Sequence, residues 1–286
     1  METVGVIGLG LMGSALAERI IAAGHQVVAN DLRADCCQRL AELGGIAKPT
    51  ASDVFASARV VVLSLPTSDD VNKVLDSVDR IFPGTRIIDT TTGDPEASAR
   101  LGQRLAAVKV EYLDATLTGS SQQARAGEVV VTAGGSLEAF HASQWLFRLF
   151  ARQWFHVGPW GSGATTKLAI NLVLGLNRAA LAEGLAFGRA SGLKLDVLLE
   201  ILRSGVAYSR AMDHKGPKMI AGDFAAEAKL EQHWKDVRLI LEAGQRVGAT
   251  MPLSHCHEEL LADLVRRGFG ADDNSCVIRA FDAKVK

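Results

Sequence analysis

The chain begins with a short apolar run that ends in a glycine-rich turn, and this segment constrains the fold more than any other. Residues 4–13 read Val-Gly-Val-Ile-Gly-Leu-Gly-Leu-Met-Gly, so Gly8, Gly10 and Gly13 follow the pattern Gly-x-Gly-x-x-Gly. In this pattern the first glycine permits a tight turn, the second lets a pyrophosphate approach bare backbone, and the third lets helix and strand pack closely. Residues 14–23 have the composition of that helix, and a helix N-terminus favours negative charge. The segment therefore predicts a dinucleotide site.

The end of the second predicted strand indicates which dinucleotide binds. Asn30 and Asp31 follow the apolar residues 27–29, and Asp31 lies 23 residues after Gly8. An acidic side chain at this distance accepts hydrogen bonds from the adenosine ribose hydroxyls and repels the 2′-phosphate of NADP. We therefore expect NAD. NADP stays open because Arg33 offers a cation for the phosphate, and Asp31 could also be an ordinary turn residue.

Two further segments lie where predicted strands end. Residues 65–67 (Leu-Pro-Thr) follow one strand, and residues 90–93 (Thr-Thr-Thr-Gly) follow the strand that ends at Asp89. Open parallel sheets bind ligands at the carboxyl ends of their strands, so both segments could contact the cofactor or could simply be turns. The residues expected to contact the cofactor in this half of the chain are Gly8, Leu9, Gly10, Leu11, Met12, Gly13, Asn30, Asp31, Leu32, Arg33, Leu65, Pro66, Thr67 and Thr91.

The composition bounds the class of protein. A chain of 286 residues is long enough for two domains with their own cores. Its formal net charge of −1 offers no basic surface for nucleic acid. The first residues lack the pattern of a secretion signal. The spacing of the cysteines does not indicate a disulfide framework, so we expect a cytoplasmic protein with free thiols. The four cysteines are Cys36, Cys37, Cys256 and Cys276.

One stretch raises the question of a membrane. Residues 168–177 carry no charge and belong to a largely apolar, helix-like run that continues to about residue 190. Arg178 and Glu183 interrupt this run well short of the roughly 20 residues that a membrane span requires. A helix that is apolar on nearly all sides, without spanning length, is buried in protein. We expect it to lie between two domains or in a subunit interface, and we expect a homodimer or homotetramer.

Strands and helices alternate in the first half of the chain. This alternation predicts an α/β fold with a doubly wound, parallel, Rossmann-type sheet over residues 1–160. The expected strands are Val4–Gly8, Val27–Asn30, Val60–Leu65, Arg86–Asp89, Val110–Asp114, Glu128–Ala133 and Trp154–Val157. Nothing strand-like follows residue 160, and glycine- or proline-containing joints occur near residues 191, 216 and 251. Residues 161–286 are therefore expected to form an all-helical domain, joined to the first through a long central helix.

Lys167 and Asn171 are the first residues that could do chemistry. They lie in Gly161-Ser-Gly-Ala-Thr-Thr-Lys-Leu-Ala-Ile-Asn171, and on a helix they project from the same face one turn apart. If this face borders the nicotinamide, Lys167 could protonate an oxygen that develops negative charge, and Asn171 could hold it in place. From spacing alone, a lysine that extends to solvent beside an asparagine that bridges helices is the more common arrangement.

A polar segment follows the strand predicted to end at Asp114. Residues 114–122 read Asp-Ala-Thr-Leu-Thr-Gly-Ser-Ser-Gln. Hydroxyls and backbone N–H groups at a glycine-containing turn suit a carboxylate or phosphate. A polar connection with an N-cap serine fits equally well. Lys235 and Asp236, in the helix expected over residues 230–247, are by themselves typical of a solvated ion pair.

The sequence His255-Cys256-His257 does not predict a metal site. On a helix, side chains two residues apart point away from each other, and no second cluster offers the remaining ligands. We therefore expect no metal, and histidines with ordinary roles in packing.

Taken together, the motifs resemble the β-hydroxyacid dehydrogenase family, which includes 3-hydroxyisobutyrate dehydrogenases and tartronate semialdehyde reductases. The resemblance covers essentially the whole chain. Its motifs, in order, are residues 8–13, the loop 114–127 ahead of Gly134-Gly135, Gly161-x-Gly-x-x-x-Lys167-x-x-x-Asn171, Lys235-Asp236 and residues 268–272. The resemblance implies reversible hydride transfer between NAD(H) and a small 3-hydroxy acid or its semialdehyde.

The resemblance also implies roles for particular residues. Lys167 is then the proton donor and Asn171 its helper, Lys235 lies near the nicotinamide and the substrate, and Thr118-Gly119-Ser120 anchors the substrate carboxylate. Reduction needs Lys167 as an ammonium and oxidation needs it neutral, so oxidation should accelerate as the pH rises. Lys167 thereby becomes the expected general acid and base.

The chain departs from the family at the substrate loop. The family usually reads Asp-Ala-Pro-Val-Ser-Gly-Gly, whereas residues 114–120 read Asp-Ala-Thr-Leu-Thr-Gly-Ser. Thr118 keeps a hydroxyl for the carboxylate. Ser120 replaces a glycine and brings a side chain and a stiffer backbone into the pocket. We therefore expect an altered substrate loop over residues 116–121, with a different acid or a different selectivity.

Two other functions are weighed against this one. Imine reductases share the fold and cofactor, but typically carry another residue at the position of Lys167 and favour NADPH. A binding module without turnover would have lost this lysine. The presence of Lys167 and Asp31 favours the hydroxyacid dehydrogenase.

Overall fold

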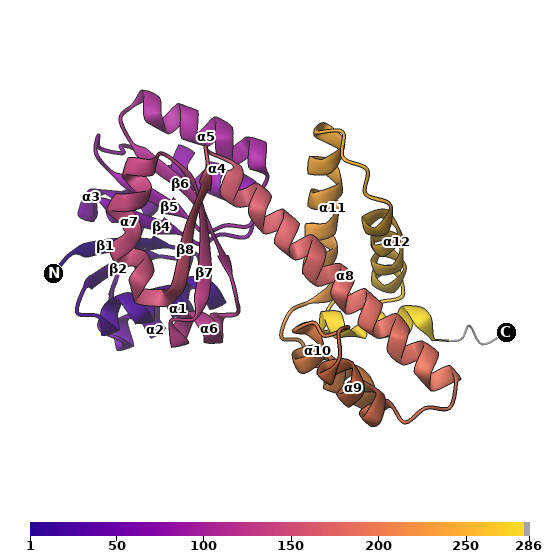
Figure 1. Cartoon of the computed structure of the whole chain (residues 1–286). Coiled ribbons are helices and arrows are strands. Elements are labelled where there is room, and N and C mark those ends of the chain that lie inside the picture. The colour runs from indigo at the N-terminus through magenta and orange to yellow at the C-terminus, as the bar shows by residue number, and fades with distance from the viewer. Residues whose placement is uncertain (283–286) are drawn as a thin grey trace. The chain divides into compact units, whose positions relative to one another are not determined.

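In the computed structural model, which describes residues 1–282, a wound sheet precedes a set of helices (Figure 1). The elements of the first half are β1 (Thr3–Ile7), α1 (Leu11–Ala22), β2 (Gln26–Asn30), α2 (Ala34–Glu42), β3 (Ile46–Ala47), α3 (Ala51–Ser57), β4 (Val60–Leu63), α4 (Ser68–Asp76), β5 (Arg86–Asp89), α5 (Pro95–Ala107), β6 (Glu111–Thr118), α6 (Ser121–Ala126), β7 (Val129–Gly135), α7 (Leu137–Phe150) and β8 (Ala151–Gly158). The second half contains α8 (Ser162–Ala190), α9 (Leu195–Ser204), α10 (Ala211–Ala221), α11 (Leu230–Arg246), α12 (Pro252–Arg266) and the 3₁₀ helix η1 (Asn274–Phe281).

The strands form one sheet of eight in the order β3-β2-β1-β4-β5-β6-β7-β8. Neighbouring strands are parallel throughout, except that β7 runs antiparallel to β6. The expected doubly wound α/β architecture is therefore confirmed, with one antiparallel pair that the sequence did not predict. The chain reverses there because only the six-residue helix α6 separates β6 from β7, which is too short for a parallel crossover.

The predicted end of β6 at Asp114 was wrong. The strand continues to Thr118, and its second half pairs with β7 from Leu113 opposite Gly135 to Thr118 opposite Val130. Thr116, Leu117 and Thr118 therefore belong to a buried strand, and the expected loop over residues 116–121 begins only at Gly119. The structure also adds the two-residue strand β3 and begins β8 at Ala151, three residues earlier than expected.

Alternate residues of the strands enter two apolar cores, one on each face of the sheet. Val6, Val62 and Ile88 pack with side chains of α1, α2, α6 and α7. Their neighbours Ile7, Val61 and Ile87 pack with α3, α4 and α5. This alternation is the period of two that a strand imposes on its side chains, and the near-continuous apolar strands follow from coverage of both faces.

The chain divides after Lys167 into two compact units, residues 1–167 and 168–286. The described part of the second unit is helical, as expected. Its core contains Leu181 and Leu185 of α8, Val237 of α11, Leu261 of α12 and Val277 of η1. Among the described helices, α8 is the one long and apolar enough to be a membrane span by length and composition, a criterion that the core helix of a globular protein also meets.

Candidate functional site

The glycine turn has the geometry that its sequence predicts. Gly8 has φ +90°, and a Cβ atom there would clash with the carbonyl of Ser64. A Cβ atom on Gly13, in the first turn of α1, would clash with the carbonyl oxygen of Gly8. A Cβ atom on Gly10 would meet nothing within 4 Å. The first and third glycines thus close the turn, and the second presents open backbone beside the N-terminus of α1, where a phosphate fits.

Asp31 ties the turn to the end of β2. Its Oδ2 accepts a hydrogen bond from the N–H of Leu9 at 2.6 Å, and its Oδ1 accepts one from the N–H of Arg33 at 2.8 Å. Asn30 points elsewhere, since its Nδ2 donates to the carbonyl oxygens of Lys48 and Pro49. The side chain of Asn30 therefore fixes the chain after β3, and a cofactor contact by Asn30 stays a prediction.

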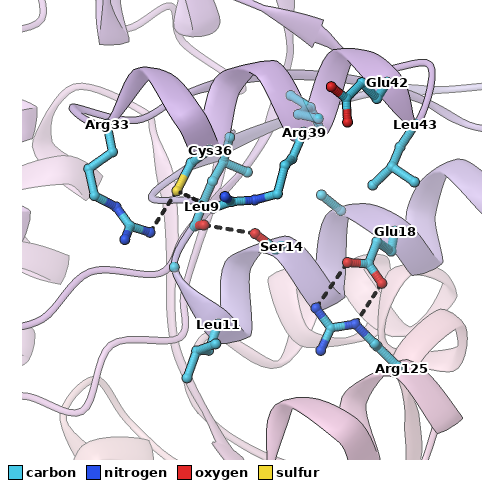
Figure 2. Close-up of a pocket in the computed structure, with 13 residues that line it drawn as sticks. Leu9, Leu11, Ser14, Glu18, Arg33, Cys36, Arg39, Glu42, Leu43 and Arg125 are labelled. Carbon is cyan, nitrogen blue, oxygen red and sulfur yellow. Dashed lines mark hydrogen bonds and ion pairs between the residues drawn. The ribbon is translucent and has the colours of Figure 1, made fainter.

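A cavity of about 450 Å³ adjoins the turn between α1 and α2 (Figure 2). Its three arginines each lie within ion-pair distance of a carboxylate. Arg33 pairs with Asp31 at 3.8 Å, Arg39 with Asp35 at 2.8 Å, and Arg125 with Glu18 at 2.6 Å. Apolar and small side chains complete the wall, among them Leu9, Ala17, Leu40 and Leu43.

Two leucines near the turn are unusually exposed. Leu11 is 75% exposed and Leu32 is fully exposed. Burial of apolar side chains against an apolar or aromatic ligand is favourable. An aromatic ring such as adenine would bury Leu11 and Leu32. Open backbone at Gly10, a carboxylate at Asp31 and these exposed side chains together fit a nicotinamide dinucleotide.

The two segments after β4 and β5 are joined by hydrogen bonds. The Oγ1 of Thr91 accepts from the N–H of Leu65 at 3.2 Å, and Thr67 caps α4 by accepting from the N–H of Asp70. The chain after Pro66 therefore begins a helix, while Thr91 fixes the end of β5 against that of β4. The predicted cofactor contacts of these residues stay predictions.

The end of β6 holds two of the predicted chemical groups. The Nζ of Lys167 donates to the carbonyl oxygen of Leu117 at 2.7 Å. The next residue, Thr118, has a buried Oγ1 for which residues 1–282 supply no hydrogen-bond partner. A buried hydroxyl without a partner is costly, so this atom is suited to receive a ligand. The structure thus brings the ammonium of Lys167, on α8, to the carbonyl of Leu117, and the next residue of the strand carries a buried hydroxyl without a partner among residues 1–282.

The last part of the predicted anchor has a structural role as well. Gly119 has φ +141°, which favours glycine. Ser120 caps α6, because its Oγ accepts from the N–H of Gln123, whose side chain in turn accepts from the N–H of Ser120. The serine that replaces the family's glycine therefore forms a capping box. Contact of Ser120 with substrate stays a prediction.

Sequence reasoning assigned no role to Asp114, yet this residue organises the start of α8. Its Oδ1 accepts from the N–H of Gly161 at 3.0 Å and its Oδ2 from that of Ala164 at 2.8 Å. Burial raises the pKa of Asp114 to about 6, against the opposing effect of these two N–H groups. The signal that could have revealed this role is an acidic residue shortly before a glycine-rich helix start.

In the helical unit, Asn171 and the Lys235-Asp236 pair are brought together. The Nδ2 of Asn171 donates to Oδ2 of Asp236 at 3.3 Å, which joins α8 to α11. Asp236 thus takes part in a contact between two helices of this unit. Lys235, next along α11, is partly buried.

The histidines of α12 have different surroundings. His255 and Cys256 are exposed, whereas His257 is buried with its ring 5.2 Å from that of His233 on α11. Burial and the charge of Arg178 lower the pKa of His257 to about 4. The four cysteines are free thiols, as expected.

Known protein families match both halves of the chain. A family model described as the NAD binding domain of 6-phosphogluconate dehydrogenase matches residues 3–158. A second, described as NAD-binding of NADP-dependent 3-hydroxyisobutyrate dehydrogenase, matches residues 161–281. The 2-(hydroxymethyl)glutarate dehydrogenase of Eubacterium barkeri is 30% identical over 284 residues, which cover 98% of this chain and 94% of that protein.

Solved structures share the fold. A 3-hydroxyisobutyrate dehydrogenase from Mycobacterium tuberculosis matches with a TM-score of 0.91 at 24% identity, over 99% of this chain and 100% of that one. An imine reductase from Pseudomonas sp. matches less well, with a TM-score of 0.67 at 21% identity over 98% of this chain and 99% of that one.

Proposed function

The chain belongs to the β-hydroxyacid dehydrogenase family and is an NAD(P)-dependent oxidoreductase, and we propose that it interconverts a small 3-hydroxy acid and its semialdehyde with Lys167 as the general acid and base. The observation that carries the assignment is the pairing on β6. The ammonium of Lys167 lies on the carbonyl of Leu117, next to the unpartnered buried hydroxyl of Thr118.

The chemistry assigns a separate task to each group. When bound, the reduced nicotinamide supplies a hydride to the carbonyl carbon of the semialdehyde. Thr118 donates a hydrogen bond to the substrate carboxylate, and the backbone around Gly119 completes this anchor. Lys167 then protonates the oxygen that becomes negative, which is the role of a positioned general acid.

Asn171 assists from the next turn of α8. The Nδ2 of its amide donates to Asp236, and the amide oxygen is by its chemistry an acceptor. An amide held in one orientation can position a lysine ammonium or a substrate hydroxyl. Lys235, beside Asp236, is the cation that we assign to the cofactor and substrate.

We assign NAD as the preferred cofactor. Asp31 ends β2 beside the glycine turn, and we assign its carboxylate to the ribose hydroxyls, where it would repel a 2′-phosphate. The nearby cavity does not offset this repulsion, because each of its arginines is paired with a carboxylate. Arg33 was the residue that left NADP open, and here it lies beside Asp31. NADP should therefore bind more weakly than NAD.

The helical unit supports assembly into a homodimer or homotetramer. Val173, Leu174 and Phe187 of α8 are 54%, 42% and 72% exposed, and Val197 and Ile201 of α9 are 46% and 60% exposed. Exposed apolar side chains on neighbouring helices favour coverage by protein. We propose that a second copy covers them, that α8 does not enter a membrane, and that the enzyme acts on its small carboxylate substrate in the cytoplasm.

A turnover panel tests the function. The enzyme is supplied with NAD or NADP and with small hydroxy acids, and the reverse reaction is run with NADH or NADPH and with the matching semialdehydes or cyclic imines. We expect turnover on at least one 3-hydroxy acid, with a higher kcat/KM for NAD than for NADP. Turnover on cyclic imines but not on any hydroxy acid would identify an imine reductase instead. Cofactor binding without turnover on the whole panel would indicate a binding module.

A further inference from the structure

We propose that Asp114 and Thr116 of β6 are positioning residues, which place Lys167 by holding the first turn of α8. This inference rests on the proposed role of Lys167 as general acid. All the contacts involved lie within residues 1–167.

The first N–H groups of a helix have no acceptor within the helix. At the start of α8, the N–H groups of Gly161 and Ala164 are satisfied by the two oxygens of one carboxylate, at 3.0 and 2.8 Å. Asp114 lies far earlier in the chain and is 2% exposed. It therefore acts as an N-cap supplied by the sheet, and its negative charge also suits the helix dipole. The helix cannot shift along β6 without breaking both bonds.

Thr116, two residues after Asp114 on β6, makes a second contact between this strand and the start of α8. Its Oγ1 lies 3.1 Å from the carbonyl oxygen of Gly163 and 2.9 Å from Oγ1 of Thr132 on β7, in a fully buried position. The hydroxyl of Thr116 donates its proton to the carbonyl oxygen of Gly163, so it can accept the proton of the Thr132 hydroxyl. The family that the chain resembles usually has proline here, which has no hydroxyl. The tie through Thr116 is thus a feature of this chain.

Glycine lets the helix start lie directly on the strands. A Cβ atom on Gly163 would clash with the carbonyl oxygen of Asp114 and come within 2.8 Å of that of Thr132. A Cβ atom on Gly134 of β7 would come within 2.6 Å of the carbonyl oxygen of Pro159 and 2.9 Å of the Gly163 nitrogen. Close packing of backbone on both sides leaves little room for the first turn to move.

As a result, both the backbone and the side-chain ammonium of Lys167 are fixed in position. Its backbone lies one helical turn after Gly163, and its Nζ donates to Leu117, the residue after Thr116. The first turn of α8 and the end of β6 together define where the ammonium lies. A displacement of about 1 Å in such a group costs on the order of 10²-fold in rate. Loss of the Asp114 or Thr116 contacts should therefore lower kcat more than it changes substrate binding.

The charge state of Asp114 should be visible in the pH profile. Burial raises its pKa to about 6, helped by the charge of Asp89 on β5. The other titratable groups nearby are Tyr112 on β6, Lys167 on α8 and His156 on β8, whose Nε2 lies 2.8 Å from the Gly135 carbonyl. β7 contributes Thr132 and Gly134, which do not titrate. An ionised Asp114 accepts at both oxygens, whereas protonation turns one oxygen into a donor. Turnover should therefore decline as the pH falls through about 6.

The test compares substitutions with matched controls in the intact enzyme. Asp114→Asn removes the charge and one acceptor, and Thr116→Val removes only the hydroxyl. Gly163→Ala pushes the helix from the strands without changing any charge. Its control is Gly184→Ala on the same helix, where a Cβ atom meets nothing within 4 Å. His156→Gln controls for a second titratable side chain, on β8, and Lys167→Ala is measured in the same series.

The expected results differ for each variant. Asp114→Asn and Gly163→Ala should lower kcat about 10²-fold and Thr116→Val about 10-fold, with KM and the NADH dissociation constant changed by no more than about twofold. The decline near pH 6 should disappear in Asp114→Asn and persist in His156→Gln. Gly184→Ala should keep the wild-type kcat.

Several outcomes would overturn the inference. Folded Asp114→Asn and Thr116→Val enzymes with wild-type kcat would show that these contacts serve stability alone, and a pH limb lost in His156→Gln would assign the limb to that histidine. If Asp114→Asn does not fold, Thr116→Val and Gly163→Ala decide by their kcat. Normal turnover of Lys167→Ala would instead contradict the proposed function, whatever the other variants do.

Discussion

Helix α8 is associated with two buried polar centres that are built in opposite ways. At its start, both oxygens of Asp114 accept backbone N–H groups at 3.0 Å or less. Further along, in the helical unit, Nε of Arg178 and the Nε2 atoms of His233 and His257 are buried, and the described residues give none of these three atoms a hydrogen-bond partner. The first centre is defined by directional bonds, and the second by the packing of side chains.

Electrostatics sharpen this difference. Burial lowers the pKa of Arg178 to about 10, although the charges of Asp273 and Asp236 oppose the effect. The same burial, with the charge of Arg178, lowers the pKa of both histidines, so they remain neutral. Their rings rest on Gly175, where a Cβ atom would come within 2.8 Å of each. A carboxylate that accepts two N–H groups can fix geometry, whereas the second centre is held by packing. Both centres make stability depend on pH, in opposite directions.

The histidine pair gives the largest expected change. Since the pKa of His257 is about 4 in the folded chain and near its ordinary value of 6.5 when unfolded, its contribution is present above pH 6.5. It is lost as the pH falls toward 4, by about 3 kcal/mol. His233 acts in the same direction. The free energy of unfolding of His257→Leu, measured against wild type by urea titration, should therefore improve relative to wild type as the pH falls. A constant difference between pH 7 and pH 4.5 would contradict the assignment.

The contribution of Asp114 to stability should depend on pH in the opposite direction to that of His257. Its pKa is about 6 in the folded chain and near 3.8 when unfolded, so the stability associated with the protonated form is present below pH 3.8. It is lost as the pH rises through 6, again by about 3 kcal/mol. The same urea titrations on Asp114→Asn should show that variant gaining on wild type from pH 4 to pH 7. If it loses ground over this interval, the carboxyl does not titrate as described.

Substitution of Arg178 should have the smallest effect, a change in the pKa of His257. It distinguishes the contribution of the arginine charge from that of burial. Arg178→Met keeps the volume apolar and removes the cation that faces both histidines. The pKa of His257, followed by the NMR shift of its ring, should rise toward its ordinary value but stay below it, because burial is the larger cause. An unchanged midpoint would show that Arg178 does not act on this histidine.

In the first unit, the sequence predicts the strands, helices and motifs better than the contacts between them. The glycine turn, Asp31 and the alternation of strands and helices are local patterns, and each was found where it was expected. The extension of β6 to Thr118 could not be read in the same way, because it depends on antiparallel pairing with β7. The capping role of Asp114 depends on Gly161, which is 47 residues away in the chain.

The second unit shows the same limit. The sequence marks Arg178 as an interruption of an apolar run, and His257 as part of a local triplet. Nothing local indicates that Arg178 is buried or that His257 packs against His233 on another helix. The sequence motifs therefore predicted which residues could bind or react. The residues that contact them are determined by tertiary packing, which the motifs do not encode.

The role of Lys167 is tested most directly by a single-turnover measurement on Lys167→Ala. The variant is first loaded with NADH, with binding checked by nicotinamide fluorescence, and then mixed with the best semialdehyde of the turnover panel. We expect NADH to bind as in wild type and its oxidation to be slower by about 10²-fold or more. NADH oxidation at a near wild-type rate would contradict the assignment of Lys167 as the general acid.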